Sequence, residues 1–335
     1  MEEISKISVI GAGAWGTALA QVCSQDNRDI TIWCREERLA EEINTLHSNK
    51  LYLGDISLNP SINATSSLEI ALKAQILLIV TPAQATRNIL EQMKPLIRPD
   101  HLLVLCSKGV EVSSEKLMSQ VVQDILPNTK LAILSGPNFA KEIAQGKPAA
   151  TTLACEDKKV GKTIQNLIAT PYFRPYLTDD IIGAQIAGAF KNVIAIACGI
   201  AHGLNLGESA RASLVTRGLA EISRLGVSMG ARAETFMGLC GVGDLMLTCS
   251  SEQSRNFSLG LLLAQGQSLE SIMKRSGSSL SEGVHTALTA LNLAEKHRIE
   301  MPISMAVYNC LHGDLSLDEA MKEMLNRKIK EELDF

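Results

Sequence analysis

A single lysine in a long apolar stretch is the first residue that could do chemistry. Lys191 is the only formal charge between Ile181 and Ile200. Burial among apolar side chains disfavours the charged form of a lysine, so its pKa falls toward the range that is useful for proton transfer. Alternatively, the ammonium reaches the surface along its aliphatic chain or pairs with a carboxylate. We interpret Lys191 as the candidate acid–base residue.

The same stretch is long and apolar enough to span a membrane. A lone lysine at the centre of a bilayer would cost several kcal/mol, and the sequence contains no second stretch of this kind. We therefore expect a helix buried in a protein core and no membrane span.

Two further groups point to an anionic substrate. Asp244 lies among glycine and apolar residues, and Ser254-Arg255-Asn256 follows it along the chain. A hydroxyl, a guanidinium and an amide together offer donors that suit a phosphate. Each has an ordinary alternative, since Asp244 could cap a helix and Arg255 could be a surface charge. In combination with Lys191 they indicate a substrate with an anionic end and a reactive oxygen.

A glycine-rich turn near the N-terminus has the spacing of a dinucleotide-binding loop. Gly11, Gly13 and Gly16 follow a predicted strand, Lys6–Ile10, and open a predicted helix, Thr17–Ser24. In such loops the first glycine makes the turn, the second lets the backbone approach a pyrophosphate, and the third lets helix and strand pack closely. The helix N-terminus offers N–H groups to the phosphates. The alternative is a glycine-rich turn with no ligand.

The end of the second predicted strand, Ile30–Trp33, bears on the choice of cofactor. Folds specific for NAD usually place an acidic residue here to bind the ribose 2′-hydroxyl. The sequence reads Cys34-Arg35-Glu36 instead, and an arginine can stack on adenine and pair with a 2′-phosphate. NADP is therefore favoured. Glu36 and Glu37 keep NAD open, and Arg35 could also be a solvated charge.

Strand and helix signals alternate through the first half of the chain. Further strands are expected at Ile76–Val80, Leu102–Cys106, Lys130–Leu134, Ala149–Ala154 and Phe173–Leu177. This alternation is typical of a parallel sheet with helices on both faces, an α/β doubly wound (Rossmann) domain. Ligands of such sheets bind at the carboxyl ends of strands, where Lys108 and Gly136 lie. Helical periodicity then takes over, so we expect a dinucleotide-binding domain over 1–178 and an all-α substrate domain over 179–335.

Composition limits the possible partners. The net charge of −4 provides no positive field for nucleic acid or acidic membranes. The eight cysteines show no metal-type spacing, so we expect no metal and free thiols in a reducing compartment. The N-terminus runs directly into a strand without the pattern of a signal peptide, which favours a cytoplasmic location.

Several motifs resemble one known family. They are GAGAWGTALA, SKGVE, SGPNFAKEIAQGKPAA, GAFKNVIAIACGI, TRGLAEISRLG, TFMGLCGVGDLMLTCSSEQSRN and LSEGVHTA, in this order. Over essentially the whole chain, the sequence is similar to bacterial NAD(P)-dependent glycerol-3-phosphate dehydrogenases. The resemblance implies an all-α C-terminal domain of the 6-phosphogluconate dehydrogenase-like type and a cytoplasmic homodimer. It also implies interconversion of dihydroxyacetone phosphate and sn-glycerol 3-phosphate for phospholipid synthesis, with NADP or NAD as cofactor.

The resemblance implies roles for individual positions. The proton-transfer lysine of the family falls on Lys191. The implied substrate contacts are Lys108, Gly136, Asn138, Asp244, Ser254, Arg255 and Asn256. Beside the three loop glycines, the implied cofactor contacts are Ala14, Trp15, Arg35, Lys108, Ala140, Arg255, Leu280 and Glu282.

Three positions depart from the family pattern. Asn138 stands where serine or threonine is more common, which puts that substrate contact in question. Phe257 stands where an arginine is often found, so we expect less positive charge beside the phosphate. The loop that contains His202 is also unusual, and we assign His202 no role.

Two rival functions stay open on the sequence. One is a dehydrogenase of the same two-domain plan that acts on a hydroxy acid. It would need a carboxylate-binding site in place of the serine–arginine–asparagine cluster. The other is a non-catalytic module that binds a dinucleotide and reports redox state. It would not need Lys191 or Asp244.

Overall fold

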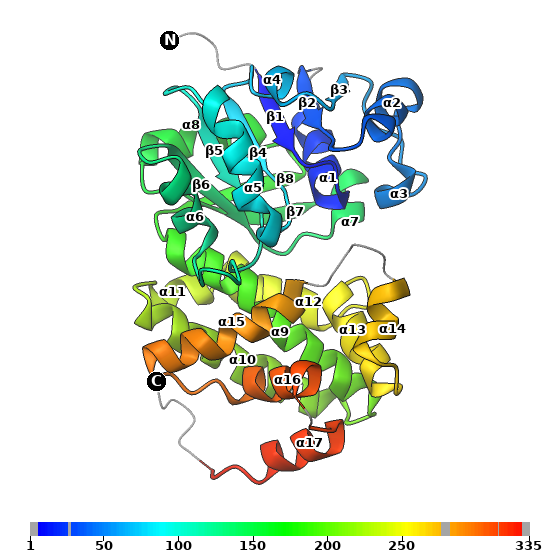
Figure 1. Cartoon of the computed structure of the whole chain (residues 1–335), viewed down its shortest axis with the longest axis vertical. Coiled ribbons are helices and arrows are strands. Elements are labelled where there is room, and N and C mark those ends of the chain that lie inside the picture. Colours follow the sequence, from blue (N-terminus) through cyan, green and yellow to red (C-terminus); the bar gives the residue numbers. More distant parts are fainter. Residues whose placement is uncertain (1–5, 26–27, 276–281, 314, 330–335) are drawn as a thin grey trace. The chain divides into compact units, whose positions relative to one another are not determined.

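Two units make up the structure, a computed structural model that describes residues 6–25, 28–275, 282–313 and 315–329. The first, which we call the sheet unit, contains the described residues up to Ser107 together with Met118–Ile181. The second, the helical unit, contains Lys108–Leu117 and the described residues from Ile182 onward. Each unit has its own hydrophobic core, and Figure 1 shows both.

An eight-stranded sheet forms the centre of the sheet unit, in the order β3-β2-β1-β4-β5-β6-β7-β8. The strands are β1 (Ile7–Ile10), β2 (Ile30–Trp33), β3 (Ile62–Thr65), β4 (Ile76–Ile79), β5 (Leu102–Leu105), β6 (Lys130–Ser135), β7 (Ala149–Ala154) and β8 (Phe173–Thr178). Every residue of β1, β4 and β5 is buried. Such continuous burial is what helices on both faces of a parallel sheet require.

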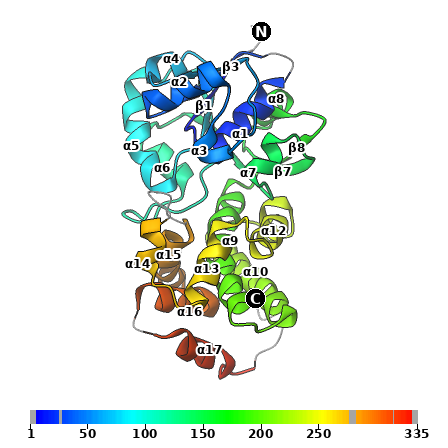
Figure 2. The ribbon, with the colours of Figure 1, turned by 90° about the vertical axis from the view of Figure 1, so that its right-hand side faces the viewer.

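The helices of the sheet unit divide into two groups. They are α1 (Ala14–Cys23), α2 (Glu37–Leu46), α3 (Lys50–Leu53), α4 (Leu68–Ala71), α5 (Ala83–Met93), η2 (Lys94–Leu96), α6 (Met118–Ile125), α7 (Ala140–Ala144) and α8 (Lys158–Ile168). Helix α1 packs against α7 and α8, whereas α5 packs against α6, and helices cover both faces of the sheet (Figures 1 and 2). The predicted doubly wound α/β domain is confirmed.

The expectation of a parallel sheet is wrong at one pair of strands. Strand β7 runs antiparallel to β6, with Ile133 opposite Ala154. The connection contains only the five-residue helix α7, which rises about 7.5 Å, whereas a six-residue strand spans about 20 Å. The chain therefore cannot return to the end of the sheet at which β6 begins, so β7 starts at the opposite end and runs antiparallel to β6. The longer α8 does return it, and β7 pairs with β8 in parallel.

Strand β3 was not expected from the sequence. Only Ile62 and Ala64 of its four residues are buried, and Asn63 is exposed. Its position at the edge of the sheet, beside β2, explains why so little apolar sequence is needed to form it.

The helical unit is built around α9 (Ile181–Gly203). The other helices are α10 (Glu208–Ser228), α11 (Ala233–Phe236), α12 (Asp244–Cys249), α13 (Arg255–Ala264), α14 (Leu269–Arg275), α15 (Glu282–His297), α16 (Pro302–His312) and α17 (Leu317–Leu325), with a π-helical turn, η3 (Leu239–Gly243). Among the described residues, α9 alone is long and apolar enough to cross a membrane, but 89% of its most apolar window is buried. This burial agrees with the predicted core helix.

Close contact between α9 and α13 depends on two glycines. A Cβ added at Gly199 would lie 2.0 Å from Phe257 O, and one added at Gly260 would lie 2.1 Å from Ile196 O. Larger residues would force the helices apart. This packing fixes the N-terminus of α13 relative to the residues of α9.

Candidate active site

Helix α9 holds Lys191 in the core of the helical unit. Lys191 is 6% exposed. Its Nζ donates to Asp244 Oδ1 at 2.5 Å and to Thr248 Oγ1 at 2.7 Å. Of the alternatives for this lysine, the side chain therefore takes the pairing with a carboxylate and does not extend to the surface.

A second lysine shares the same carboxylate. Lys108 Nζ donates to Asp244 Oδ2 at 2.7 Å, and the side chain of Lys108 is 21% exposed whereas that of Asp244 is 2% exposed. The segment that carries Lys108 is anchored by Val110 and Leu117, which are buried in the helical core. Two ammonium groups on one carboxylate leave an excess positive charge, which favours an anionic substrate and a developing alkoxide.

The environment sets the proton affinity of the buried amine. Burial lowers the pKa of Lys191 to about 8; the charge of Asp244 acts against this shift, and the positive charge of Lys108 adds to it. A pKa near 8 lets one amine give and take a proton under physiological conditions.

A tight backbone turn presents Asp244 to both lysines. Asp244 begins α12 directly after η3, where Gly241 adopts φ −93° and ψ −106°. A Cβ at Gly241 would lie 2.1 Å from Phe236 O, so only glycine fits here. The predicted glycine-rich surroundings of Asp244 thus have a steric cause.

Thr248 belongs to this cluster and was missed by the sequence interpretation. It lies four residues after Asp244 on α12, so both side chains share one helix face. Its Oγ1 donates to the backbone carbonyl of Asp244 at 2.6 Å while it accepts from Lys191. The four-residue spacing was the signal that could have identified it.

The N-terminus of α13 carries the predicted phosphate cluster. Ser254 caps the helix, with its Oγ accepting from Phe257 N at 3.3 Å, and Arg255 is the first helical residue. The positive end of the helix dipole makes such a position favourable for anions. The cluster therefore has the electrostatics of a phosphate site.

Asn256 has a more structural place than the sequence indicated. Its Nδ2 donates to Asn192 Oδ1 at 2.9 Å, and its Oδ1 accepts from Gly283 N at 3.1 Å. Asn256 thus ties α13 to α15 and to the residue that follows Lys191 on α9. These bonds hold the phosphate cluster and the amine in one rigid arrangement.

Phe257 and His202, at two positions that depart from the family pattern, lie beside each other. Phe257 is 2% exposed in the helical core, and its ring centroid lies 5.5 Å from that of His202. The expectation of less positive charge beside the phosphate stays a prediction, because a buried phenyl ring adds no charge there. Of the two predicted cofactor contacts nearby, Glu282 begins α15 and Leu280 lies outside the described residues.

The glycine-rich loop of the sheet unit has the geometry expected of a dinucleotide site. A Cβ at Gly16 would lie 1.9 Å from Gly11 O, which shows how closely α1 approaches the loop. A Cβ at Gly13 would meet nothing within 4 Å, so the backbone there is open to a phosphate. The loop follows β1 at the point where the strand order reverses, between β1 and β4, the usual ligand position in such sheets.

Residues around this loop fit the predicted cofactor contacts. Ala14 and Trp15 begin α1, and Trp15 Nε1 is buried with no hydrogen-bond partner among the described residues. Arg35 is exposed and donates to Glu36 Oε1 at 2.8 and 2.6 Å. The indole N–H is therefore an unused donor, and the guanidinium is exposed with Glu36 as its partner.

The turn after β6 contains the remaining predicted residues. Gly136 packs so closely on the neighbouring strand that a Cβ there would lie 2.8 Å from Thr151 Oγ1. Asn138 Oδ1 is buried and lacks a hydrogen-bond partner in the described chain. Ala140 begins α7. Asn138 can therefore accept a hydrogen bond from a ligand, as serine or threonine would.

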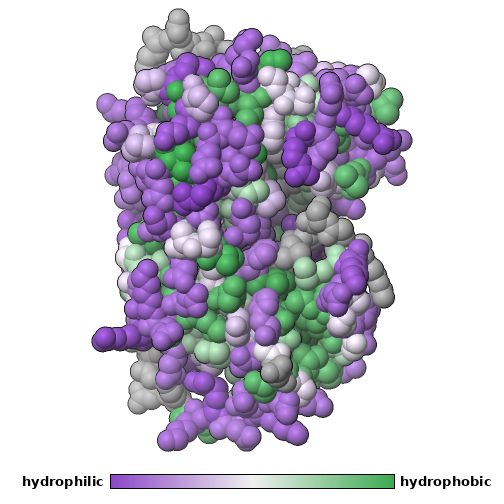
Figure 3. All heavy atoms as spheres, in the orientation of Figure 1, coloured by the Kyte–Doolittle hydropathy of each residue, from purple (hydrophilic) through white to green (hydrophobic). Residues whose placement is uncertain are grey.

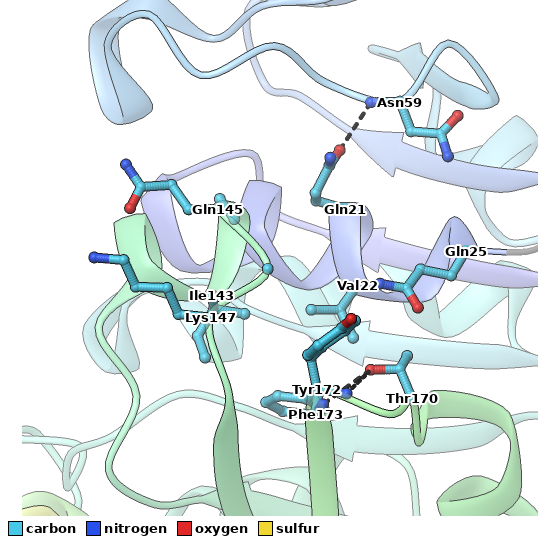
Figure 4. A pocket seen from close by; sticks show the side chains of 12 residues that line it. Gln21, Val22, Gln25, Asn59, Ile143, Gln145, Lys147, Thr170, Tyr172 and Phe173 are labelled. Atoms are coloured by element: carbon cyan, nitrogen blue, oxygen red, sulfur yellow. Dashed lines mark hydrogen bonds between the residues drawn. The ribbon is translucent and has the colours of Figure 1, made fainter.

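Two cavities lie away from all of these residues. One of about 200 Å³ lies at the C-terminal end of α1, where Gln21 Oε1 accepts from Asn59 N (Figure 4). The other, of about 820 Å³, is lined by residues of α9, α10, α16 and α17, in the unit whose surface in Figure 3 carries broad hydrophobic areas. In the described ranges no group of three or more His, Cys, Asp or Glu side chains is placed to hold a metal.

Known proteins match the chain along nearly its full length. A family model described as NAD-dependent glycerol-3-phosphate dehydrogenase N-terminus matches residues 6–161, and its C-terminus counterpart matches 180–322. A Parvibaculum lavamentivorans protein named glycerol-3-phosphate dehydrogenase (NAD(P)+) is 50% identical over 98% of both chains. The chain belongs to the NAD-dependent glycerol-3-phosphate dehydrogenase family.

Solved structures of this family have the same fold. The glycerol-3-phosphate dehydrogenase of Coxiella burnetii is 36% identical, with a TM-score of 0.92 over 96% of this chain and 99% of that one. The Saccharomyces cerevisiae enzyme is 28% identical, with a TM-score of 0.83 over 97% and 100%. The resemblance inferred from the motifs, and the two-domain fold it implied, are confirmed.

Proposed function

We propose that this protein interconverts dihydroxyacetone phosphate and sn-glycerol 3-phosphate with NADP or NAD, using Lys191 as general acid and base. The observation that carries the proposal is the buried Lys191–Asp244–Lys108 cluster, tied through Asn192 and Asn256 to the N-terminus of α13, which we propose binds the phosphate. A three-carbon substrate with a phosphate at one end and a carbonyl at the other requires both features.

Lys191 does the proton chemistry in this proposal. In the reducing direction its ammonium donates a proton to the carbonyl oxygen as negative charge develops there. In the oxidising direction the neutral amine takes the hydroxyl proton. The nicotinamide, when bound, supplies or accepts the hydride. Asp244 and Thr248 hold the amine in place, and Lys108 stabilises the anionic substrate.

The phosphate end is assigned to α13. Its N-terminal N–H groups, the Ser254 hydroxyl and the Arg255 guanidinium supply the donors, and Asn256 keeps them in position relative to α9. Gly136 and Asn138 are proposed as further substrate contacts from the sheet unit, supported by the unpaired Asn138 Oδ1.

The cofactor is assigned to residues 1–178, and catalysis to 179–335 with Lys108 added. The three loop glycines, Ala14, Trp15, Arg35, Lys108, Ala140, Arg255, Leu280 and Glu282 are the proposed cofactor contacts. NADPH is favoured because the exposed Arg35–Glu36 ion pair is weak and a 2′-phosphate can replace Glu36 as partner of the guanidinium. We also propose a cytoplasmic homodimer that supplies glycerol phosphate for phospholipid synthesis and needs no metal.

An absorbance assay at the reduced-nicotinamide band tests the proposal. Dihydroxyacetone phosphate is offered with NADPH and with NADH separately, and a keto acid serves as the control substrate. We expect rapid oxidation of the cofactor with dihydroxyacetone phosphate and none with the keto acid. We also expect a higher kcat/KM with NADPH than with NADH.

The same assay separates the rival functions. Turnover of the keto acid in place of the phosphate substrate would favour a hydroxy-acid dehydrogenase. Cofactor binding without turnover of either substrate would favour a redox-sensing module. The buried lysine–carboxylate cluster argues against a sensor, which needs no proton donor. The donors at the N-terminus of α13 argue against a carboxylate substrate, which needs no phosphate site.

A further inference from the structure

Asn49 is a fully buried polar residue that contacts the glycine-rich loop. Its Nδ2 donates to Ala12 O at 3.0 Å and to Thr17 Oγ1 at 2.8 Å. Thr17 Oγ1 in turn donates to Ala12 O at 3.3 Å. Because a carbonyl oxygen can only accept, these three bonds determine which end of the Asn49 amide faces the loop.

The contacts fix the orientation of one peptide group in the loop. In a trans peptide the carbonyl of Ala12 and the N–H of Gly13 point in opposite directions. With Ala12 O held by two donors, the Gly13 N–H must point away from Asn49 and Thr17. Gly13 is also the loop glycine beside which a Cβ meets nothing within 4 Å, so the fixed N–H belongs to the open part of the loop.

Asn49 is itself held firmly by its own segment. Its backbone carbonyl accepts from Leu53 N at 2.8 Å as the cap of α3. Glu42 Oε1 accepts from the next residue, Lys50 N, at 2.9 Å. Helices α2 and α3 follow directly on Arg35, so Asn49 connects the segment proposed for the adenosine end of the cofactor to the loop proposed for its phosphates.

We propose that Asn49 is a positioning residue for dinucleotide binding: it holds the Ala12–Gly13 peptide so that the Gly13 N–H is presented to the cofactor pyrophosphate. The inference rests on the proposed function, which supplies the dinucleotide. Since NADPH and NADH share the pyrophosphate, loss of Asn49 weakens the binding of both cofactors equally. Proton transfer by Lys191 is unaffected.

Calorimetric titration of the full-length protein with NADPH and NADH tests this role. For Asn49→Ala we expect Kd to rise about tenfold for both cofactors, the usual scale for lost buried hydrogen bonds. At saturating cofactor, kcat and the KM for dihydroxyacetone phosphate should stay near wild type. Thr17→Val removes the second donor to Ala12 O and should act in the same direction, which provides a test if Asn49→Ala does not fold.

Asn44→Ala is the matched control. Asn44 makes two comparable bonds in the same unit, to Ala64 O at 2.9 Å and from Ala64 N at 2.7 Å, but does not bond to the glycine-rich loop. It should lower the melting temperature without changing either Kd. Three outcomes would overturn the role of Asn49 but not the proposed function. They are an unchanged Kd in both test variants, weaker binding of only one cofactor, or equally weakened binding in Asn44→Ala. Absence of cofactor binding by the wild type would overturn the proposed function and this role together.

Discussion

Lys191 Nζ and Asp244 Oδ1 lie 2.5 Å apart, although the two side chains are only 8% and 2% exposed. Removing both charges from water is costly, and the pair persists because each charge compensates the other. Burial alone would drive the amine toward its neutral form, and Asp244 opposes that shift, so the pKa settles at about 8. The carboxylate thus keeps the amine able to act in both protonation states.

Replacement of this amine tests the chemistry most directly. For Lys191→Ala we expect kcat to fall by about two to four orders of magnitude, the scale of general acid–base catalysis. Cofactor binding should change little. Lys162→Ala, which removes an exposed lysine of α8, is the control and should keep wild-type turnover. Near-normal kcat in Lys191→Ala would reject the role of Lys191.

The pH dependence should report the same group. Because reduction needs the ammonium form, kcat for reduction of dihydroxyacetone phosphate should fall as pH rises through about 8. Oxidation of glycerol 3-phosphate needs the neutral amine and should rise over the same interval. Initial rates in both directions between pH 6 and pH 10 would show this. Parallel profiles in the two directions would contradict the assignment.

Two glycines of the loop should respond differently to the same substitution. Gly13 has extended backbone dihedrals, φ −70° and ψ −180°, and space for a methyl group. Gly13→Ala should therefore fold normally but bind NADPH and NADH at least about tenfold more weakly, because the methyl lies where the pyrophosphate would approach.

Gly16→Ala is expected to affect stability instead. Its methyl would overlap Gly11 O at 1.9 Å, so α1 must move or the unit must unfold, with a loss of more than about 2 kcal/mol. Thermal unfolding followed by circular dichroism distinguishes the two variants. Equal melting temperatures for both would show that α1 can move without cost.

Arg35 should decide between the two cofactors. Arg35→Gln removes the guanidinium that would pair with a 2′-phosphate, so we expect Kd for NADPH to rise about tenfold, as for a lost charge-assisted bond. Binding of NADH should be nearly unchanged. Arg38→Gln, on the exposed first turn of α2, is the matched control. Equal losses for NADPH and NADH would assign Arg35 to a part that both cofactors share.

Glu221 makes stability depend on pH. Its carboxylate, on α10, accepts from Ile303 N at 2.7 Å and from Ser304 N at 3.2 Å at the start of α16. Burial raises the pKa of Glu221 from 4.5 to about 7, against these hydrogen bonds. The folded state therefore binds more protons than the unfolded state between these values, so the contribution of Glu221 is present below about pH 4.5 and lost as pH rises through about 7.

Glu221→Gln should remove this dependence. The amide offers one acceptor where two backbone N–H groups and the Ser304 hydroxyl donate, so we expect a loss of about 1–3 kcal/mol at pH 5 and a smaller loss at pH 8. Urea unfolding at the two pH values measures both. Equal losses at the two pH values would show that folding does not change the protonation of Glu221 over this range.

The features that could be predicted from the sequence are those that depend on a local pattern of residues. The apolar run of α9, the glycine spacing of the loop and the β-branched strands each have a period or spacing that one segment reveals, and these elements form as expected. The burial of Lys191 followed from its surroundings alone. Its pairing with Asp244 did not, because 53 positions separate the two residues and only packing of the helices brings them together.

The remaining differences arise from tertiary context. The antiparallel β7 depends on the length of α7, and β3 depends on the neighbour that β2 provides at the sheet edge. The burial of Phe257 was not predicted, because it depends on how α13 turns that side chain into the core of the helical unit. The sequence of one segment does not reveal strand direction, edge pairing or side-chain burial of this kind, because each depends on a neighbouring element that is distant in sequence.

The helical unit is not a continuous piece of the chain. The backbone leaves the sheet unit after Ser107, returns at Met118 and leaves again after Ile181. A gene fragment that starts at residue 182 would encode Asp244 and Lys191 without Lys108, and the complementary fragment would carry Val110 and Leu117 without the core they pack into. A chimera made from two homologous genes would therefore need junctions near residues 107, 118 and 181 to keep the helical unit from one parent. With a single junction near residue 181, Lys108 would come from one parent and Asp244 from the other.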